Sequence, residues 1–391
     1  MTTSQQAAPH LSEAAPAGTA PRALAPDLAR GAMLLAIAFA HAPLFIADVT
    51  KSPAWAGALT DVFLFLFVNN HARPLFAFLF GYSLVQLLDR RLARGSGWVS
   101  ARKLLRRRGW WLVVFGLAHT VLLVPIDILA GYGVSALIFV PLLRRSDKAV
   151  LWTAGLAMVP ATVLSAIGLW LPMSQGRRTY EAGSVVTGQG ASYLSGLAER
   201  AGSWPFSLVV ETLIVIPGVL FGMWAARRRF LDRPQAHRPL LARAAVLTTI
   251  VSIAGSLPAA LMHAGVWTGA PAGVLWIAVL LQPLTGYAGG VGMAAIVALV
   301  ATTATAERRG PFTTMVEALG QRSMTFYLFQ SVAFLLIFAP FGLGLQDDLG
   351  LAGATAIAAL IWVLSLVLAD LMRRARYRGP FENLLRRLAY R

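Results

Sequence analysis

The sequence predicts an all-α integral membrane protein, a bundle of about ten transmembrane helices plus one half-helix. Apolar residues make up 57% of the 391 residues and charged residues only 13%, whereas soluble domains carry about 25% charged residues. Apolar segments long enough to cross a bilayer, about 20 residues, recur along the chain. Arginine is concentrated in every second connection between them, which is typical of membrane proteins whose basic loops face the cytoplasm.

About ten segments qualify as spans, some of them only with residues borrowed from their ends. They are residues 28–46, 74–88, 110–124, 128–143, 150–171, 206–226, 244–262, 274–301, 324–341 and 351–371. Residues 54–68 are less apolar and contain Asp61. We expect them to form a half-helix or re-entrant segment that does not cross the bilayer, because protein can bury such a piece at membrane depth.

The charges predict the orientation of these spans. The basic connections are residues 90–108, 144–148, 227–243 and 308–322 and the segment after residue 372, whereas residues 125–127, 172–204, 264–273 and 342–350 carry few cations. This alternation indicates a multi-pass protein of the cell (plasma) membrane with both termini in the cytoplasm. The long external connection, residues 172–204, is expected to form a lid over an outer cavity.

Composition limits the other classes of function. The net charge of +17 follows the loops, so we attribute it to topology and expect no nucleic acid partner. The chain has no cysteine, which excludes disulfides, thiol catalysis and cysteine-ligated metals. We divide it into a disordered cytoplasmic tail (1–26), a transmembrane domain (27–372) and a basic cytoplasmic tail (373–391). P-loop, dinucleotide-binding, zinc-protease and serine-hydrolase motifs are not found, and no metal is expected.

Ionisable side chains inside hydrocarbon are costly, so each calls for a partner or a function. His119 lies in the middle of its predicted span, Asp127 follows at a tight turn, and Tyr132 lies one turn into the next span. A histidine beside a carboxylate suits a general base or a proton relay. The alternative is structural, with His119 bonded to a backbone carbonyl and Asp127 capping the next helix.

Further polar residues cluster toward the predicted outer half of the membrane. His41 lies near the outer end of the first span, and His71 and Arg73 begin the next. These side chains either line a polar vestibule or reach to the interface. Glu211 is the natural partner of Arg73 or of a histidine, whereas Gln330 either binds substrate or links helices.

We therefore expect a single cavity, open to the outside and lined by most of these groups. The predicted catalytic residues are His119, Asp127, His41 and Asp61, and the predicted substrate-binding residues are His71, Arg73, Tyr132, Glu211 and Gln330.

Five stretches of the sequence resemble the YeiB-like family, whose C-terminal blocks define the domain of unknown function 418. They are DLARGAMLLAIAFAH in the first span, HARPLFAFLFGYSLVQLL in the second, RRRGWWLVVFGLAHTVLLVPIDILAGYGVSALI, LGQRSMTFYLFQS and the terminal RGPFENLLRRLAY. They follow the family's order from residue 27 to residue 390. The resemblance implies a helical membrane protein and supplies no activity.

A more distant resemblance is to transmembrane acyltransferases such as heparan-α-glucosaminide N-acetyltransferase. Those proteins move an acyl group from a cytoplasmic donor to an acceptor beyond the membrane, using a histidine in an H-x-x-W-x-G stretch. Here Ser52 occupies the position of that histidine, before Trp55 and Gly57, while Asp61 is in place and His41 replaces an asparagine. Acyl transfer in this chain therefore requires His41, His119 or His71 as the base.

The function that these observations favour is acyl transfer to a small or lipid-linked acceptor, with an acyl-CoA docked on the cations of residues 90–108. The alternative is a transporter or exporter of a small polar or amphipathic solute in which the histidines relay protons. The third possibility is a non-catalytic membrane scaffold. A cavity that reaches the cytoplasmic side near the histidine distinguishes the enzyme from the transporter.

Overall fold

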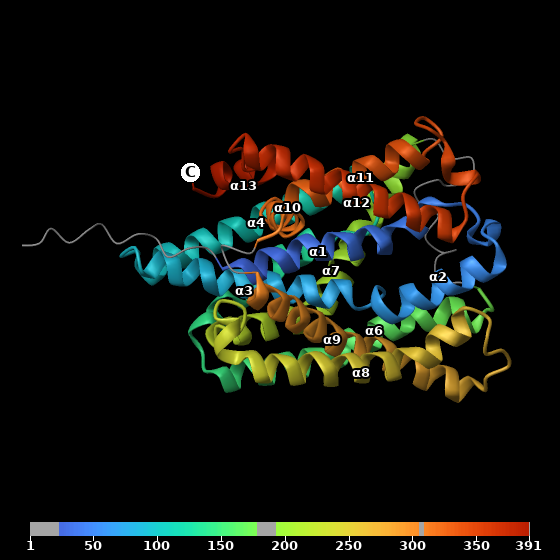
Figure 1. Ribbon diagram of the computed structural model, residues 1–391, viewed down its shortest axis with the longest axis horizontal. Coiled ribbons are helices and arrows are strands. Elements are labelled where there is room, and N and C mark those ends of the chain that lie inside the picture. The colour runs from blue at the N-terminus through green and yellow to red at the C-terminus, as the bar shows by residue number, and fades with distance from the viewer. Residues whose placement is uncertain (1–22, 178–192, 305–308, 391) are drawn as a thin grey trace, which may run out of the picture.

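The computed structural model describes residues 23–177, 193–304 and 309–390, and every regular element within them is a helix (Figure 1). The α-helices are α1 (Leu24–His41), α2 (Ala54–Phe67), α3 (Ala72–Leu92), α4 (Trp98–Leu122), α5 (Leu129–Phe139), α6 (Asp147–Ser174), α7 (Tyr193–Arg227), α8 (Arg238–His263), α9 (Ala272–Thr303), α10 (Pro311–Gly320), α11 (Ser323–Phe338), α12 (Leu351–Arg374) and α13 (Pro380–Tyr390).

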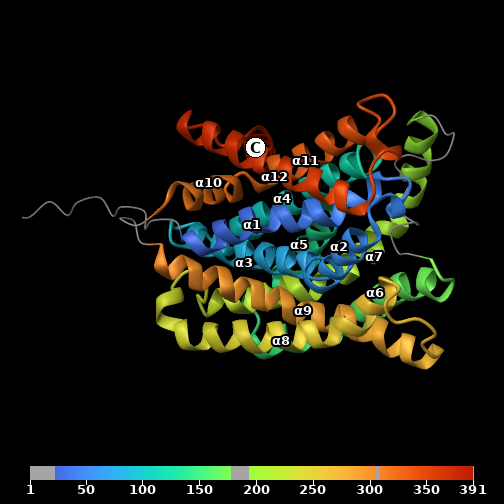
Figure 2. The same ribbon diagram turned by 45° about the vertical axis from the view of Figure 1, so that its right-hand side comes forward.

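Seven helical stretches of the described chain are long and apolar enough to cross a membrane. They are Leu24–Phe45, Ala54–Leu92, Asp147–Ser174, Gly196–Arg227, Pro234–His263, Ala272–Thr303 and Leu351–Arg374. Leu129–Arg144 and Ser323–Phe338 are shorter apolar helices, and α4 carries its cations on its first half. The expected helical bundle is thus confirmed. Helices α1, α3, α8 and α9 run along its long axis in both views (Figures 1 and 2).

Apolar side chains cover the outside of the bundle as well as its core. Trp152, Leu156 and Val159 on α6 are 65%, 69% and 65% exposed, and α8 has a similar row of exposed apolar side chains, Val246, Leu247, Ile250 and Val251. Exposed apolar surface of this extent marks an interaction surface. Together with the long apolar helices it is consistent with a lipid bilayer environment.

Glycines bring α3 and α7 into close contact. A Cβ atom at Gly222 would lie 1.9 Å from the carbonyl oxygen of Phe78, and one at Gly81 would lie 1.9 Å from that of Val219. Helices in membranes associate through such small residues because lipid supplies no hydrophobic drive between them. The close approach brings Glu211, on α7, into ion-pair contact with Arg73, on α3.

Helix α2 differs from the expected independent half-helix. It is 14 residues long but continues into α3 after a short break, so that Ala54–Leu92 forms one apolar stretch of 39 residues. At the break Asn70 adopts a left-handed conformation with φ of 59°, which asparagine tolerates better than most residues. Side chains bond the interrupted backbone, since Gln282 Nε2 donates to Asn69 O at 2.8 Å and His71 Nδ1 lies 2.7 Å from the same oxygen.

Two basic segments expected as a loop and a tail are helical. The arginines of residues 90–108 lie at the end of α3 and on the first turns of α4, with only residues 93–97 between the helices. Arginine is a good helix former, and its long side chain keeps its charge in water while its stem packs. In the segment after residue 372, α13 packs against α4 and α11. We call this end, with the α3–α4 connection and α13, the basic end (left in Figure 1).

The remaining expectations concern segments that the structure describes only in part. The proposed lid, residues 172–204, contains the end of α6 and the first turns of α7, and residues 178–192 lie outside the described residues. The proposed disordered tail also lies outside them up to residue 22, and α1 already begins at Leu24.

Candidate functional site

His119 and Asp127 lie together inside the bundle, as the short turn between α4 and α5 predicts. Nδ1 of His119 is 3.1 Å from Oδ1 of Asp127, an ion-pair distance without hydrogen-bond alignment. Nε2 of His119 lies 2.8 Å from Oγ of Ser331 on α11. The side chains of His119 and Asp127 are 0% and 2% exposed. The order Ser331–His119–Asp127 gives the imidazole one nitrogen toward a carboxylate and the other toward a hydroxyl, the arrangement of a general base.

Asp127 also has the structural role that was the alternative. Its Oδ2 accepts a hydrogen bond from the backbone N–H of Ala130 at 2.7 Å and so caps α5. A Cβ atom at Gly116 would lie 2.2 Å from that same Oδ2. The Gly116 face of α4 therefore packs on α5, and this face carries His119 into the interior, as their spacing predicts.

Tyr327 and His41 complete the group around the histidine. The Tyr327 ring centroid lies 4.8 Å from that of His119 and 6.0 Å from that of His41. Its hydroxyl donates a long hydrogen bond of 3.4 Å to Oδ1 of Asp127. We define the polar cluster as His41, His119, Asp127, Tyr327 and Ser331.

The pair Arg73–Glu211 borders the polar cluster. Nε of Arg73 is 3.5 Å from Oε2 of Glu211, and the two side chains are 27% and 14% exposed. Glu211 also has an electrostatic interaction with Asp127, and His41 has one with Arg73. The predicted partnership of Arg73 with Glu211 thus agrees with the structure. Tyr132 lies nearby, stacked against Phe80 with ring centroids 5.0 Å apart.

Several buried polar atoms have no hydrogen-bond partner among the described residues. They include the hydroxyl of Tyr132, both side-chain polar atoms of Gln330 and Nδ1 of His41, and also the hydroxyls of Thr162 on α6 and Ser256 on α8. Buried polar groups are nearly always bonded to protein or water. Because such atoms occur throughout the bundle, the substrate-binding role of Tyr132 and Gln330 stays a prediction.

Asp61 and His71 have partners outside the polar cluster, and the expectation of one cavity lined by most of these groups stays a prediction. Oδ2 of Asp61 is 2.8 Å from Nδ1 of His263, and both side chains are fully buried. The ionisable groups singled out from the sequence do not include His263. Nε2 of His71 lies 2.6 Å from Oγ of Ser252 on α8. Both pairings involve α8, which is distant in sequence, so no local pattern indicates them.

A large cavity of about 740 Å³ opens at the basic end and reaches the polar cluster. Four aromatic side chains line it beside the polar cluster: Phe76, Phe80, Tyr132 and Tyr327. Eight arginines also line it, of which Arg90, Arg94, Arg378 and Arg386 are exposed and Arg30, Arg91, Arg108 and Arg322 are partly or fully buried. The sequence predicted a cavity open to the outer side and did not predict this one. Its arginines come from α1, the end of α3, α4, the start of α11 and the segment of α13, so the fold brings together cations that are far apart in the sequence.

Glu382 is the acidic side chain of this wall, and it is held by protein. Its Oε1 accepts hydrogen bonds of 3.0 Å from the N–H groups of Met324 and Thr325, and Oε2 is bonded to the Thr325 hydroxyl. Burial raises the pKa of the Glu382 carboxyl above its usual range and lowers that of the Arg322 guanidinium. The carboxylate caps α11 and fixes α13 against the cavity.

Two members of the polar cluster, Tyr327 and Ser331, were not predicted. Both lie in the stretch LGQRSMTFYLFQS, four residues apart and hence on one face of α11. Neither is charged, so a search for ionisable groups in hydrocarbon passes over them. All five stretches that carry the family resemblance contribute to the cavity wall or the polar cluster, through Arg30, Phe80, His119, Tyr327 and Glu382.

The fold and site define the class: a polytopic helical membrane protein with a buried histidine–carboxylate pair behind an arginine-lined cavity. Residues 225–391 match the family model described as protein of unknown function (DUF418), which agrees with the resemblance noted in that part of the sequence. The chain is also similar to the uncharacterized protein YxaH of Bacillus subtilis (strain 168), with 25% identity over 356 residues, 85% of this chain and 82% of that protein.

Proposed function

We propose that the protein is a membrane acyltransferase that binds an acyl-CoA in the arginine-lined cavity and transfers the acyl group to an acceptor at His119. The observation that carries the proposal is the extent of the cavity. Arginines line it at the basic end, and it reaches Tyr327, whose side chain packs against that of His119. Arginine suits the phosphates of the donor. The aromatic part of the lining suits the narrower pantetheine chain of acyl-CoA, which carries the thioester toward the polar cluster.

The reaction follows from the geometry of the histidine. Nε2 of His119 takes the proton of an acceptor hydroxyl or amine, and Asp127 orients the ring and stabilises its charged form. The acceptor atom bonds to the thioester carbonyl carbon, the C–S bond breaks, and the thiolate leaves as coenzyme A after protonation. Ser331 Oγ, 2.8 Å from Nε2, marks the position of the acceptor hydroxyl. Arg73 and Glu211, the partly exposed pair, border the route by which an acceptor from the outer side arrives.

The test is binding and turnover of acetyl-CoA by the full chain in lipid nanodiscs. The variant Arg90→Gln/Arg94→Gln/Arg386→Gln removes three cations from the cavity mouth, and we expect it to weaken acetyl-CoA binding at least about tenfold. The control Arg233→Gln/Arg238→Gln/Arg243→Gln removes three exposed cations, one between α7 and α8 and two on α8, and should bind as the unmodified protein does. Equal affinity in all three proteins, or no binding at all, would refute the proposal.

A transporter with a histidine proton relay is the second candidate. Two observations favour it: the broken helix α2–α3, since discontinuous helices build the sites of many transporters, and the second buried pair Asp61–His263. The two candidates differ in what happens to the donor. An acyltransferase consumes acetyl-CoA and releases a free thiol, whereas a transporter leaves acetyl-CoA intact and moves protons across proteoliposomes.

A further inference from the structure

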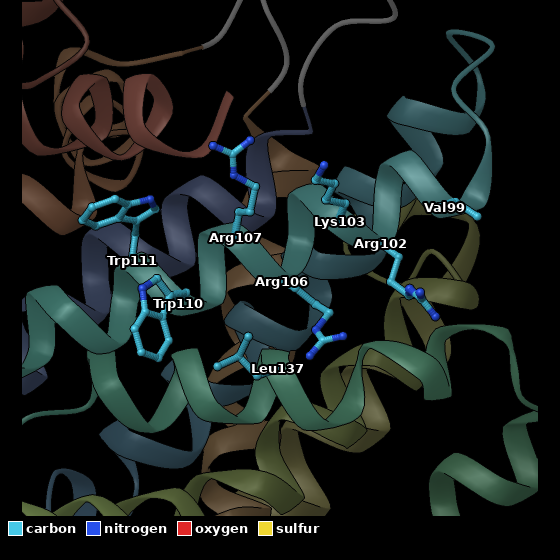
Figure 3. Close-up of a pocket in the computed structure, with 8 residues that line it drawn as sticks. All are labelled: Val99, Arg102, Lys103, Arg106, Arg107, Trp110, Trp111 and Leu137. Carbon is cyan, nitrogen blue, oxygen red and sulfur yellow. The ribbon is translucent and has the colours of Figure 1, made fainter. Parts of the chain in front are cut away.

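A second concave site lies on the outer surface of α4, away from the arginine-lined cavity. It is a groove of about 470 Å³ between α4 and α5, and none of its lining residues lines the larger cavity. Its lining is Val99, Arg102, Lys103, Arg106, Arg107, Trp110, Trp111 and Leu137, all shown in Figure 3. Cations and tryptophans thus share one small surface at the basic end.

The spacing of these residues orders them by depth. Arg102, Arg106 and Trp110 follow one another at four-residue intervals, and so do Lys103, Arg107 and Trp111. Residues four apart lie on one helix face, about 6 Å apart along the axis. Each row therefore runs from two cations, nearer the basic end, to a tryptophan deeper along α4. Figure 3 shows Arg102, Arg106 and Trp110 on the side of α4 that faces Leu137.

The cations of the groove are available to a ligand. In the part of the chain that the structure describes, no acidic side chain is paired with Arg102, Lys103 or Arg106, and all three side chains are exposed. Trp110 is 58% exposed although it is large and apolar. The groove therefore has cations without acidic partners at one end and an exposed aromatic side chain at the other. This arrangement complements a ligand with an anionic end and an apolar end.

We propose that this groove binds an anionic phospholipid of the leaflet at the basic end. Arg102 and Arg106, on the side of α4 that faces Leu137, bind the head-group phosphate, and Lys103 adds positive charge beside them. An acyl chain lies along Trp110 and Leu137. Cationic pockets beside transmembrane helices attract anionic head groups electrostatically, and tryptophan prefers the level of the membrane interface. Arg107, by contrast, contacts α13, since its Nη2 donates a 3.5 Å hydrogen bond to Leu388 O.

The experiment is native mass spectrometry of the purified full chain titrated with phosphatidylglycerol or with phosphatidylcholine of the same acyl chains. We expect phosphatidylglycerol to bind in preference. In Arg102→Gln/Lys103→Gln/Arg106→Gln its affinity should fall at least about tenfold, and in Trp110→Ala it should fall several-fold with no change of charge.

The matched control is Arg233→Gln/Arg238→Gln/Arg243→Gln, which loses the same charge on exposed residues outside the groove. It should keep its preference for phosphatidylglycerol. Equal binding of the two lipids overturns the proposal, as does unchanged binding in the groove variant. An equal loss in the control also overturns it, since only the overall charge then matters. Acetyl-CoA binding, measured on the same proteins, reports separately on the acyltransferase proposal.

Discussion

Replacing His119 is the most direct test of the proposed chemistry. Its two nitrogens face Asp127 and Ser331, and its ring lies against Tyr327 at the end of the cavity. We expect His119→Ala to lower the rate of acyl transfer by about 100-fold or more, the range for loss of a general base. Acetyl-CoA binding should stay the same, because His119 does not line the cavity. Turnover and affinity, measured separately in nanodiscs, check this.

Ser331→Ala is the companion variant. In direct transfer Ser331 only occupies the place of the acceptor, so this variant should keep its turnover within about tenfold of the unmodified protein. A loss as large as that of His119→Ala, together with an acyl group found on Ser331 by mass spectrometry, would contradict direct transfer and indicate a covalent intermediate.

At the residue scale, the sequence predicted pairs that are close along the chain better than pairs that are distant. His119 and Asp127 are joined by one tight turn, so their meeting follows from the turn. Asp61 and His263 are separated by 202 positions, and their contact depends on α2 packing against α8. Without knowledge of which helices are neighbours, a buried acid can be recognised but its partner cannot.

At the scale of elements, the crossing of α3 and α7 depends on glycine. A Cβ atom at Gly222 would lie 1.9 Å from Phe78 O, whereas one at Gly155 on α6 meets nothing within 4 Å. We expect Gly222→Ala to destabilise the protein by about 1–3 kcal/mol through overpacking. Gly155→Ala should have no effect or stabilise it by up to about 1 kcal/mol. Thermal unfolding of the two variants in one detergent compares their stabilities. Equal unfolding temperatures would contradict a stabilising role for the close contact between α3 and α7.

The apolar pattern predicted the helices well and their ends less well. The ends of α3 and α4 were missed because the apolar pattern stops where the arginines begin, while the helix continues through them. Helix α13 was missed for a similar reason: it is short and mostly polar, and its apolar side chains are buried only by packing against α4 and α11. Tertiary contact stabilises such segments, so hydropathy alone does not detect them.

At the scale of the whole molecule, the orientation in the membrane remains a prediction from charge. The absence of cysteine makes single-cysteine labelling clean. We expect Val266→Cys, 65% exposed in the α8–α9 connection, to react with an impermeant maleimide in intact cells. His237→Cys should react only after the membrane is opened, because its connection carries the local excess of arginine. Labelling of position 237 in intact cells would show that the orientation is the opposite of the predicted one, with the cavity at the basic end open to the outside.

The cavity at the basic end was not predicted. The polar groups are expected to hydrate from the outer side, since most of them are predicted to lie toward that half of the membrane. The cavity at the basic end lies among arginines that the charge pattern assigned to topology. Arginine can mark the cytoplasmic side of a membrane protein or bind a ligand. Only the three-dimensional arrangement, in which Arg30, Arg94 and Arg386 line one cavity, distinguishes a binding surface from a row of interfacial anchors.

The break between α2 and α3 has a mechanical consequence. An intact helix resists bending because each bend strains its backbone hydrogen bonds, whereas here side chains of Gln282 and His71 bond the backbone at the break. Each such bond contributes only about 1 kcal/mol, so backbone bonding at the break resists a bend less than a continuous helix would. The packing of α2 on α8, including the buried contact of Asp61 with His263, holds α2 in place instead. The angle between α2 and α3 is therefore set by tertiary contacts, and a change that loosens the contact with α8 is felt first at Asn70.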